Sequence, residues 1–166
     1  MINNTERTQI INNLVNNGVS IPCPDGVIIE STVEIGKDTV IMPNTILMGN
    51  VKIGNGCVIG PNSYIVDTVV GDNTKLNNTQ AYSSKIGPRV TAGPFVHIRP
   101  NCDIADNVHI GNFVEVKNST VDEGSKLPHL LYVGDSDVGK DVNFGCGCVT
   151  VNYDGRNKSR TTVKDG

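Results

Sequence analysis

Residues 35–60 read IGKDTVIMPNTILMGNVKIGNGCVIG, and in and around this stretch an aliphatic side chain returns at every sixth position. The aliphatic series is Ile29, Ile35, Ile41, Leu47, Ile53, Ile59 and Ile65, and a smaller residue follows each of them four positions later: Val33, Thr39, Thr45, Val51, Cys57, Ser63 and Val69. A period of six matches neither the 3.6-residue period of an amphipathic helix nor the alternation of a half-buried strand. It is the period of the hexapeptide repeat, and it predicts an all-β fold, a parallel β-helix.

Three six-residue units would form one triangular coil, so that Ile35 lies beneath Ile53 and Ile41 beneath Ile59. Neighbouring coils would stack about 4.8 Å apart through parallel backbone hydrogen bonds. The aliphatic side chains then fill the prism, and the small residues fit its corners. We expect about seven coils over residues 27–153, with Ile35, Ile53, Ile59, Ile98 and Ile110 buried.

The repeat slips in three places. One residue is missing at Asp67–Val70 and two at Tyr82–Lys85, and the unit that starts at Val116 is also short. We expect each slip to alter one turn while the stack continues. Residues 152–160, NYDGRNKSR, break the pattern altogether and predict a polar, basic loop extruded from the prism. Loops held on rigid scaffolds often carry function.

Residues 1–20 do not follow the repeat, and they predict a short helix. Asn4 or Thr5 would cap it, Gly18 would end it, and one apolar face would hold Ile10, Ile11, Leu14 and Val15. Such a helix would cover the open edge of the first coil. The predicted organisation is therefore a helix over residues 1–20 and a β-helix over residues 21–166.

Composition narrows the class of protein. Hydrophobic residues make up 37% of the chain and there is no Trp, as expected for a narrow prism filled with small aliphatic side chains. The net charge of −3 argues against a nucleic-acid partner. No stretch resembles a membrane span or a signal peptide, so we expect a cytoplasmic protein.

The five cysteines are read as small hydrophobic residues in a reducing compartment. Three of them, Cys57, Cys102 and Cys148, occupy the small corner place of a repeat. The pair Cys146 and Cys148 has a C-x-C spacing that suggests a metal or redox site, but it lacks the second ligand pair of a zinc site. We expect no metal there.

Polar candidates for chemistry lie between residues 97 and 160. Arg99, Lys117 and Lys158 are either solvated surface charges or, taken together, a grip for a phosphate group. His129 is either a corner residue or a neutral imidazole acting as general base near pH 7. A carbonic-anhydrase-like zinc site would need all three histidines, but His97 and His109 are separated by two repeats and so fall on different faces of a coil that is made of three.

Three longer motifs carry a specific resemblance. They are GPFVHIRP at residues 93–100, HIGNFVEVKN at 109–118 and NYDG at 152–155. These motifs, and the chain as a whole, resemble the acetyltransferase domain of the bacterial bifunctional N-acetylglucosamine-1-phosphate uridyltransferase/glucosamine-1-phosphate N-acetyltransferase. That family's domain is a left-handed parallel β-helix and a homotrimer with active sites between subunits. It transfers acetyl from acetyl-CoA to glucosamine 1-phosphate, without a metal, in the synthesis of UDP-N-acetylglucosamine and cell-wall precursors.

The resemblance implies a role for each candidate residue. His129 would be the general base, and Arg99, Lys117 and Lys158 would hold the sugar phosphate. Tyr132 and Asn143 would contact the sugar, with Glu115 beside them, while Cys146, Asn152 and Tyr153 would contact acetyl-CoA. Cys146 stands where the family usually has alanine, so its sulfur would lie near the thioester.

Two alternatives remain open at this point. One is a trimeric scaffold that keeps a sugar-phosphate site without catalysis, and the other is an acetyltransferase for a different amino sugar. The family also continues for several coils beyond the position of Gly166 and makes acetyl-CoA contacts there. We therefore expect this chain to bind the sugar phosphate better, relative to the complete domain, than it binds acetyl-CoA.

Overall fold

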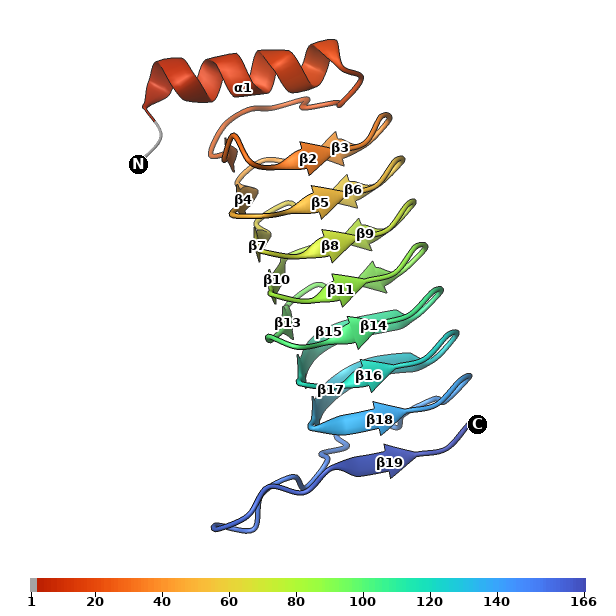
Figure 1. Ribbon diagram of the computed structural model, residues 1–166. Coiled ribbons are helices and arrows are strands. Elements are labelled where there is room, and N and C mark those ends of the chain that lie inside the picture. The colour runs from red at the N-terminus through yellow and green to blue at the C-terminus, as the bar shows by residue number, and fades with distance from the viewer. Residues whose placement is uncertain (1–2) are drawn as a thin grey trace.

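The computed structural model describes residues 3–166 and shows a tall prism of stacked coils with one helix lying across its first end (Figure 1). The helix is α1 (Asn4–Asn16). The strands are β1 (Ile28–Ile29), β2 (Glu34–Ile35), β3 (Val40–Ile41), β4 (Ile46–Met48), β5 (Lys52–Ile53), β6 (Val58–Ile59), β7 (Tyr64–Val66), β8 (Val69–Val70), β9 (Lys75–Leu76), β10 (Thr79–Tyr82), β11 (Lys85–Ile86), β12 (Thr91–Ala92), β13 (Val96–Ile98), β14 (Asp103–Ile104), β15 (His109–Lys117), β16 (Thr120–Val121), β17 (Lys126–Gly134), β18 (Ser136–Val138) and β19 (Thr161–Val163).

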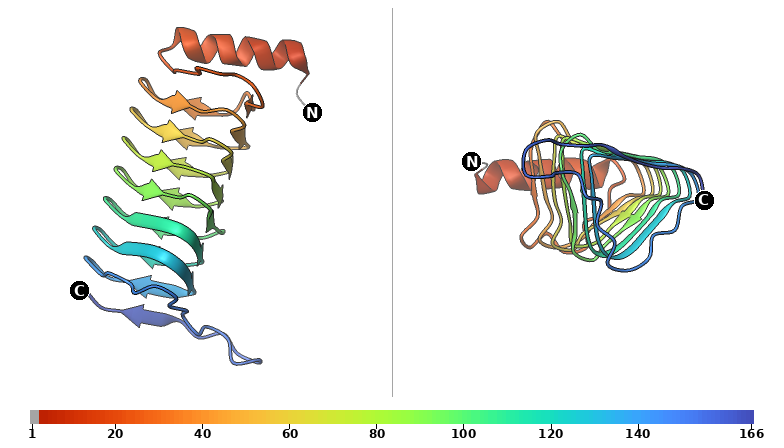
Figure 2. Two further views of the ribbon diagram at one scale, coloured as in Figure 1. Left: turned by 180° about the vertical axis from the view of Figure 1, so that it is seen from behind. Right: turned by 90° about the horizontal axis from the view of Figure 1, so that it is seen from below.

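Every strand pairs in parallel with its counterpart one coil away. One face follows the order β1-β4-β7-β10-β13-β15, a second follows β3-β6-β9-β12-β15, and a third follows β2-β5-β8-β11-β14-β16-β18-β19. The long strands β15 and β17 turn a corner and so join the first two faces into one sheet. Seen along the stack, the coils superimpose as three-sided rings (Figure 2). The predicted parallel β-helix of about seven turns is confirmed.

The inward aliphatic column forms the core. Ile53 is 5% exposed, and Ile59, Ile98 and Ile110 are fully buried, as predicted. The spacing predicts that Ile35 is buried as well, but it is only partly buried. The reason is its position, because β2 is the end strand of its sheet and has a neighbouring strand on one side only.

The slips shorten single turns and leave the stack intact, as expected. The two residues assigned to Tyr82–Lys85 are, however, lost from two turns, because the buried residues Leu76, Ala81 and Ile86 are each five positions apart. The pairing of Ile28 with Ile46 spans three full repeats, whereas the pairing of Tyr64 with Gln80 spans a shorter segment of chain. One corner assignment is wrong: Thr68 is the buried corner residue and Val69 is 46% exposed, because the missing residue shifts the register by one place. Because of the same shifts, Val70, Leu76 and Ala81 do not fall at the positions that a strict period of six predicts, although all three are buried.

The helix at the first end matches its prediction in outline. Its N-terminal cap is Asn3, whose side-chain oxygen accepts the N–H of Glu6 at 2.9 Å. The predicted caps, Asn4 and Thr5, do not have this role. Ile10 and Leu14 pack on the core, but Val15 is 48% exposed and does not belong to the buried face. Of the predicted range 1–20, residues 1 and 2 lie outside the described part of the chain.

At the other end, between β18 and β19, the chain leaves the prism and then returns as β19 (Figure 1). Tyr153 and Lys158 form an antiparallel bridge, so the intervening residues make a small hairpin. We call residues 152–160 the hairpin. Cys57 and Cys102 are buried at corners, and burial raises the pKa of both thiols. The repeat predicts a buried corner for Cys148 too, but this residue is exposed because the chain departs into the hairpin instead of completing that coil.

Candidate functional site

Three cations predicted to bind phosphate meet at one hollow on a corner of the prism. Arg99 follows β13 and Lys117 ends β15, so the two lie at the same corner in neighbouring coils. The hollow has a volume of about 300 Å³ and is lined by Arg99, Pro100, Asn101, Lys117, Asn118, Asp135 and Lys158. We call it the cation hollow. Three cations facing one carboxylate give it a positive balance, although the chain as a whole is acidic.

Asp135 is the hub of the cation hollow. Its carboxylate accepts the side-chain N–H of Asn118 at 2.6 Å and the ammonium of Lys117 at 3.0 Å, and it also accepts an N–H from Asn152. These hydrogen bonds, first of all the one from Asn118, lower the pKa of Asp135 from 3.8 to about 2. The side chain of Asp135 is only 9% exposed. The charge at the base of the hollow is therefore fixed at neutral pH, and it holds Lys117 in place.

Arg99 is fixed by a partner on the next coil. Its guanidinium donates to Glu115 at 2.9 Å, and this hydrogen bond raises the pKa of Arg99. Glu115 pairs in register with Tyr132 on the following coil, so both side chains project from one face beside the cation hollow. We call this surface of Glu115 and Tyr132 the Tyr132 face. A planar guanidinium held from one side keeps further N–H groups for an anion.

Tyr132 links that face to the hairpin. Asn152 Nδ2 donates to the hydroxyl of Tyr132 at 3.2 Å as well as to Asp135. Within the hairpin, the carboxylate of Asp154 accepts the backbone N–H groups of Arg156 and Asn157 at 2.7 and 2.6 Å, which closes the tip. The hairpin that brings Lys158 to the hollow is therefore ordered by its own hydrogen bonds.

His129 lies apart from the cation hollow, on β17. Its Nδ1 is 2.8 Å from Oδ1 of Asn112, the residue that pairs with it on β15. In the neutral imidazole, an amide oxygen in that place favours the tautomer with Nδ1–H, and Nε2 is then the nitrogen that can accept a proton. His129 is exposed and lies on β17 just before the corner at Leu130, whereas Tyr132 lies just after it. The geometry suits a general base that works at one end of the Tyr132 face.

The remaining candidates do not line the cation hollow. Asn143 forms a backbone bridge with Lys126 on the coil above, and its side chain is exposed. Cys146 is exposed next to β17, where the N–H of Gly147 donates to the carbonyl of His129 at 3.3 Å. Tyr153 is 57% exposed, and its hydroxyl donates to the carbonyl of Gly155. Cys146 thus lies on the coil next to His129, while Tyr153 lies in the hairpin.

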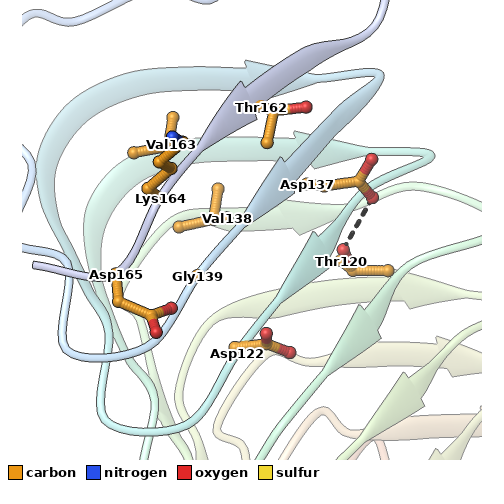
Figure 3. A pocket seen from close by; sticks show the side chains of 9 residues that line it. All are labelled: Thr120, Asp122, Asp137, Val138, Gly139, Thr162, Val163, Lys164 and Asp165. Carbon is orange, nitrogen blue, oxygen red and sulfur yellow. Dashed lines mark hydrogen bonds between the residues drawn. The ribbon is translucent and has the colours of Figure 1, made fainter.

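A larger hollow, about 510 Å³, runs over β16, β18 and β19 (Figure 3). Three aspartates, Asp122, Asp137 and Asp165, line it, with Lys164 as its cation. That charge balance opposes a phosphate. Among residues 3–166, moreover, no three His, Cys, Asp or Glu side chains gather as a metal site would require.

Sequence reasoning missed Asn112, Asn118 and Asp135. Asn118 and Asp135 occupy a corner where the backbone has a positive φ, 46° and 47°, a conformation that Asn and Asp adopt readily. Because either residue is ordinary at such a corner, the sequence alone does not indicate that Asn118 and Asp135 also form part of the cation hollow. The one available signal is that Asp135 follows Lys117 by about one coil length.

Comparison with known proteins identifies relatives that match nearly the whole chain. Residues 32–66 and 83–118 match the model of the bacterial transferase hexapeptide (six repeats) family. The bifunctional protein GlmU of Listeria monocytogenes serotype 4a (strain HCC23) is 46% identical over 157 residues, which cover 95% of this chain and 34% of that protein. GlmU of Geobacillus sp. (strain WCH70) is 51% identical over 160 residues, which cover 96% of this chain and 35% of that protein.

Similarity to solved structures is more distant. A UDP-N-acetylglucosamine acyltransferase from Campylobacter jejuni is 17% identical, with a TM-score of 0.40 over 75% of this chain and 67% of that one. The chain spans about a third of the length of the curated relatives that it matches. No helix in residues 3–166 has the length and apolar character needed to cross a membrane. The chain has a hexapeptide β-helix, and its sequence is similar to these relatives along nearly its entire length. It therefore belongs to the bacterial hexapeptide transferase family and is homologous to about one third of GlmU.

Proposed function

We propose that the chain transfers acetyl from acetyl-CoA to the amine of glucosamine 1-phosphate. The observation that carries the proposal is the cation hollow, where Arg99, Lys117 and Lys158 converge. Guanidinium and ammonium groups form charge-assisted hydrogen bonds to phosphate, which are among the stronger polar contacts in proteins. The neighbouring Tyr132 face would then receive the sugar ring.

The reaction would proceed by direct attack. The amine and the phosphate of the acceptor sit on adjacent ring carbons, so a phosphate in the hollow would direct the amine along the Tyr132 face, towards His129. Nε2 of His129 would take the proton from the attacking nitrogen, while the nitrogen forms a bond to the acetyl carbon and the C–S bond to coenzyme A breaks. General base catalysis of this kind contributes about 10²- to 10⁴-fold.

Acetyl-CoA would bind beside this face as co-substrate. Cys146 is exposed on the coil next to His129, and Asn152 at the base of the hairpin has its amide already donating to Asp135 and Tyr132. Tyr153 offers an exposed ring. These residues suit the acyl and pantetheine end of the molecule, and the chemistry calls for no metal. We place the reaction in the cytoplasm, where acetyl-CoA is made.

We also propose a homotrimer. Phe95 and Phe113 stack at 5.2 Å between ring centroids, and Leu130 continues the series on the next coil. We call these three residues the apolar ridge. They are 57%, 53% and 57% exposed, so the single chain leaves three large apolar side chains in water beside His129. A neighbouring subunit would cover them.

The direct test is acetyl transfer by the purified chain, followed as release of the coenzyme A thiol with glucosamine 1-phosphate as acceptor. The proposal predicts turnover that depends on both substrates. Turnover with another amino sugar alone would redefine the acceptor. Binding of the sugar phosphate without turnover would reduce the protein to a scaffold that retains the site.

A further inference from the structure

The hairpin is tied to the prism at both ends by one short segment, residues 135–137. At the start, Asn152 donates to the carboxylate of Asp135. At the return, the N–H of Thr161 donates to the carbonyl of Asp135 at 3.0 Å. The base is also closed on itself, because the N–H of Ser159 donates to the carbonyl of Asn152 at 2.9 Å. The loop that carries Lys158 is therefore attached to the same segment that supplies the hub of the cation hollow.

Arg160 makes four such attachments to the prism, more than any other residue of the hairpin. Its Nε donates to Asp137 Oδ2 at 2.6 Å, and Nη2 reaches the other carboxylate oxygen, which gives a bidentate pair. Two further N–H groups donate to backbone carbonyls, Nη1 to Asn118 at 2.9 Å and Nη2 to Ser136 at 3.2 Å. One guanidinium thus spans two coils and fixes the end of the hairpin.

Asp137 is committed to this pair. It also accepts the hydroxyl of Thr120 at 2.8 Å, shown as the dashed line in Figure 3. Arg160 first, and then Thr120, lower the pKa of Asp137 from 3.8 to about 2. Asp137 and Arg160 do not line the cation hollow, yet Lys158, two positions before Arg160, does. The pair therefore bears on the hollow only through the hairpin.

We propose that Arg160 and Asp137 are positioning residues that hold Lys158 over the cation hollow before a ligand arrives. A lysine on a free loop would lose much conformational freedom when it binds a phosphate, and that loss weakens binding. A hairpin fixed at its base removes the loop's share of that loss in advance. The inference rests on the proposed function for the identity of the ligand, glucosamine 1-phosphate.

Two measurements on Asp137→Asn test the proposal. Hydrogen exchange of the amides of Ser159 and Thr161, read by mass spectrometry on the hairpin peptide, should quicken about tenfold as the base opens locally. The dissociation constant for glucosamine 1-phosphate, from calorimetry, should rise about five- to tenfold. Glu34→Gln is the matched control, because it removes a carboxylate from the exposed ion pair with Lys52 near the other end of the prism. It should change neither value.

A double-mutant cycle shows whether Arg160 and Asp137 act through their mutual contact or independently. If the pair acts as a unit, Asp137→Asn, Arg160→Gln and the double variant should reach similar exchange rates, whereas independent effects would multiply. Unchanged exchange in Asp137→Asn overturns the anchoring, and faster exchange with unaltered sugar-phosphate affinity overturns the positioning role. If the wild-type chain neither bound this ligand nor transferred acetyl, the proposed function would fail, while the exchange rates would still decide whether the pair holds the hairpin.

Discussion

One corner of the prism is built differently in its first and its later coils. Asn44, Asn62 and Asn78 occupy it in the first half, and Phe95, Phe113 and Leu130 occupy the same register afterwards. All six have a positive φ, between 44° and 62°. The left-handed backbone conformation is thus kept at this corner along the stack, while the type of side chain that adopts it changes.

The difference separates structural requirements from functional ones. Asparagine tolerates the left-handed conformation, whereas a bulky residue in it is disfavoured by about 1–2 kcal/mol. The later coils accept this strain three times and expose the side chains that cause it. The cation hollow, His129 and the hairpin all belong to these later coils. Where a regular scaffold departs from its own local preference, a second requirement is acting.

The largest effect is expected from His129→Ala. Loss of the proposed general base should lower kcat for acetyl transfer about 10²- to 10⁴-fold. The fold should persist, because the side chain is exposed and carries little packing. Steady-state kinetics and circular dichroism measure the two properties.

His109→Ala is the control for that experiment, since His109 is also exposed and its ring also bonds a neighbouring side chain, that of Thr91. It should keep near wild-type turnover. Near-full activity in His129→Ala would remove this residue from the mechanism.

Phe113→Asn should act in opposite directions on the subunit and on the assembly. The isolated fold should gain stability, by about 1 kcal/mol, because asparagine relieves the left-handed strain. The trimer should weaken, because about half of the phenylalanine surface lies on the proposed interface. Light scattering across a dilution series measures the assembly, and chemical denaturation measures the subunit.

Asn62→Phe makes the reverse exchange at the same corner in the first half. It should destabilise the fold and leave the association unaffected. A trimer of unchanged stability in Phe113→Asn would mean that the apolar ridge is not the interface.

A smaller effect is expected from Asp135→Asn, and it should depend on pH. The pKa of Asp135 is lowered in the folded chain, from 3.8 to about 2, so its contribution to stability is complete above pH 4 and is lost as the pH falls towards 2. We expect this variant to be about 1–2 kcal/mol less stable at pH 7, with the difference shrinking below pH 4. Urea denaturation at several pH values measures it.

Asp67→Asn is the matched control, because Asp67 lies on the same corner with the same φ of 47°. Its carboxylate accepts the N–H of Asn50, and no ion pair is found for it within residues 3–166. It should lower the free energy of unfolding at pH 7 less than Asp135→Asn does, because no ion pair is lost. An equal loss of stability at pH 7 in the two variants would show that Lys117 and Asn118 do not stabilise the charge of Asp135.

Most of the scaffold could be predicted from the sequence, because one physical demand repeats. Each coil must bury an aliphatic side chain on each face, so Ile53, Ile59, Ile98 and Ile110 identify themselves by spacing alone. Shortened repeats defeat that logic at Val70 and Ala81, where the chain drops a turn residue and keeps the core position. Handedness is not contained in the period, and only the resemblance to a family supplies it.

The site could be predicted only in part. Arg99, Lys117 and Lys158 stand out as cations, and the motifs assign them to phosphate. Their organiser, Asp135, gives no signal of its own, because aspartate is an ordinary choice at a left-handed corner. The pair of Arg160 and Asp137 joins residues 23 positions apart across the hairpin. That separation follows no repeat, so no periodicity reveals it.

If the proposed function is right, the cation hollow selects a phosphorylated amino sugar for acetyl transfer. The most direct measurement is the ratio of kcat/KM for glucosamine 1-phosphate to kcat/KM for glucosamine, in the wild-type chain and in Lys117→Ala. We expect a ratio above about 100 in the wild type, since each charge-assisted contact to phosphate contributes about 1.5–3 kcal/mol, and a fall of at least about tenfold in the variant. A wild-type ratio near one, or a ratio that Lys117→Ala leaves unchanged, would contradict it.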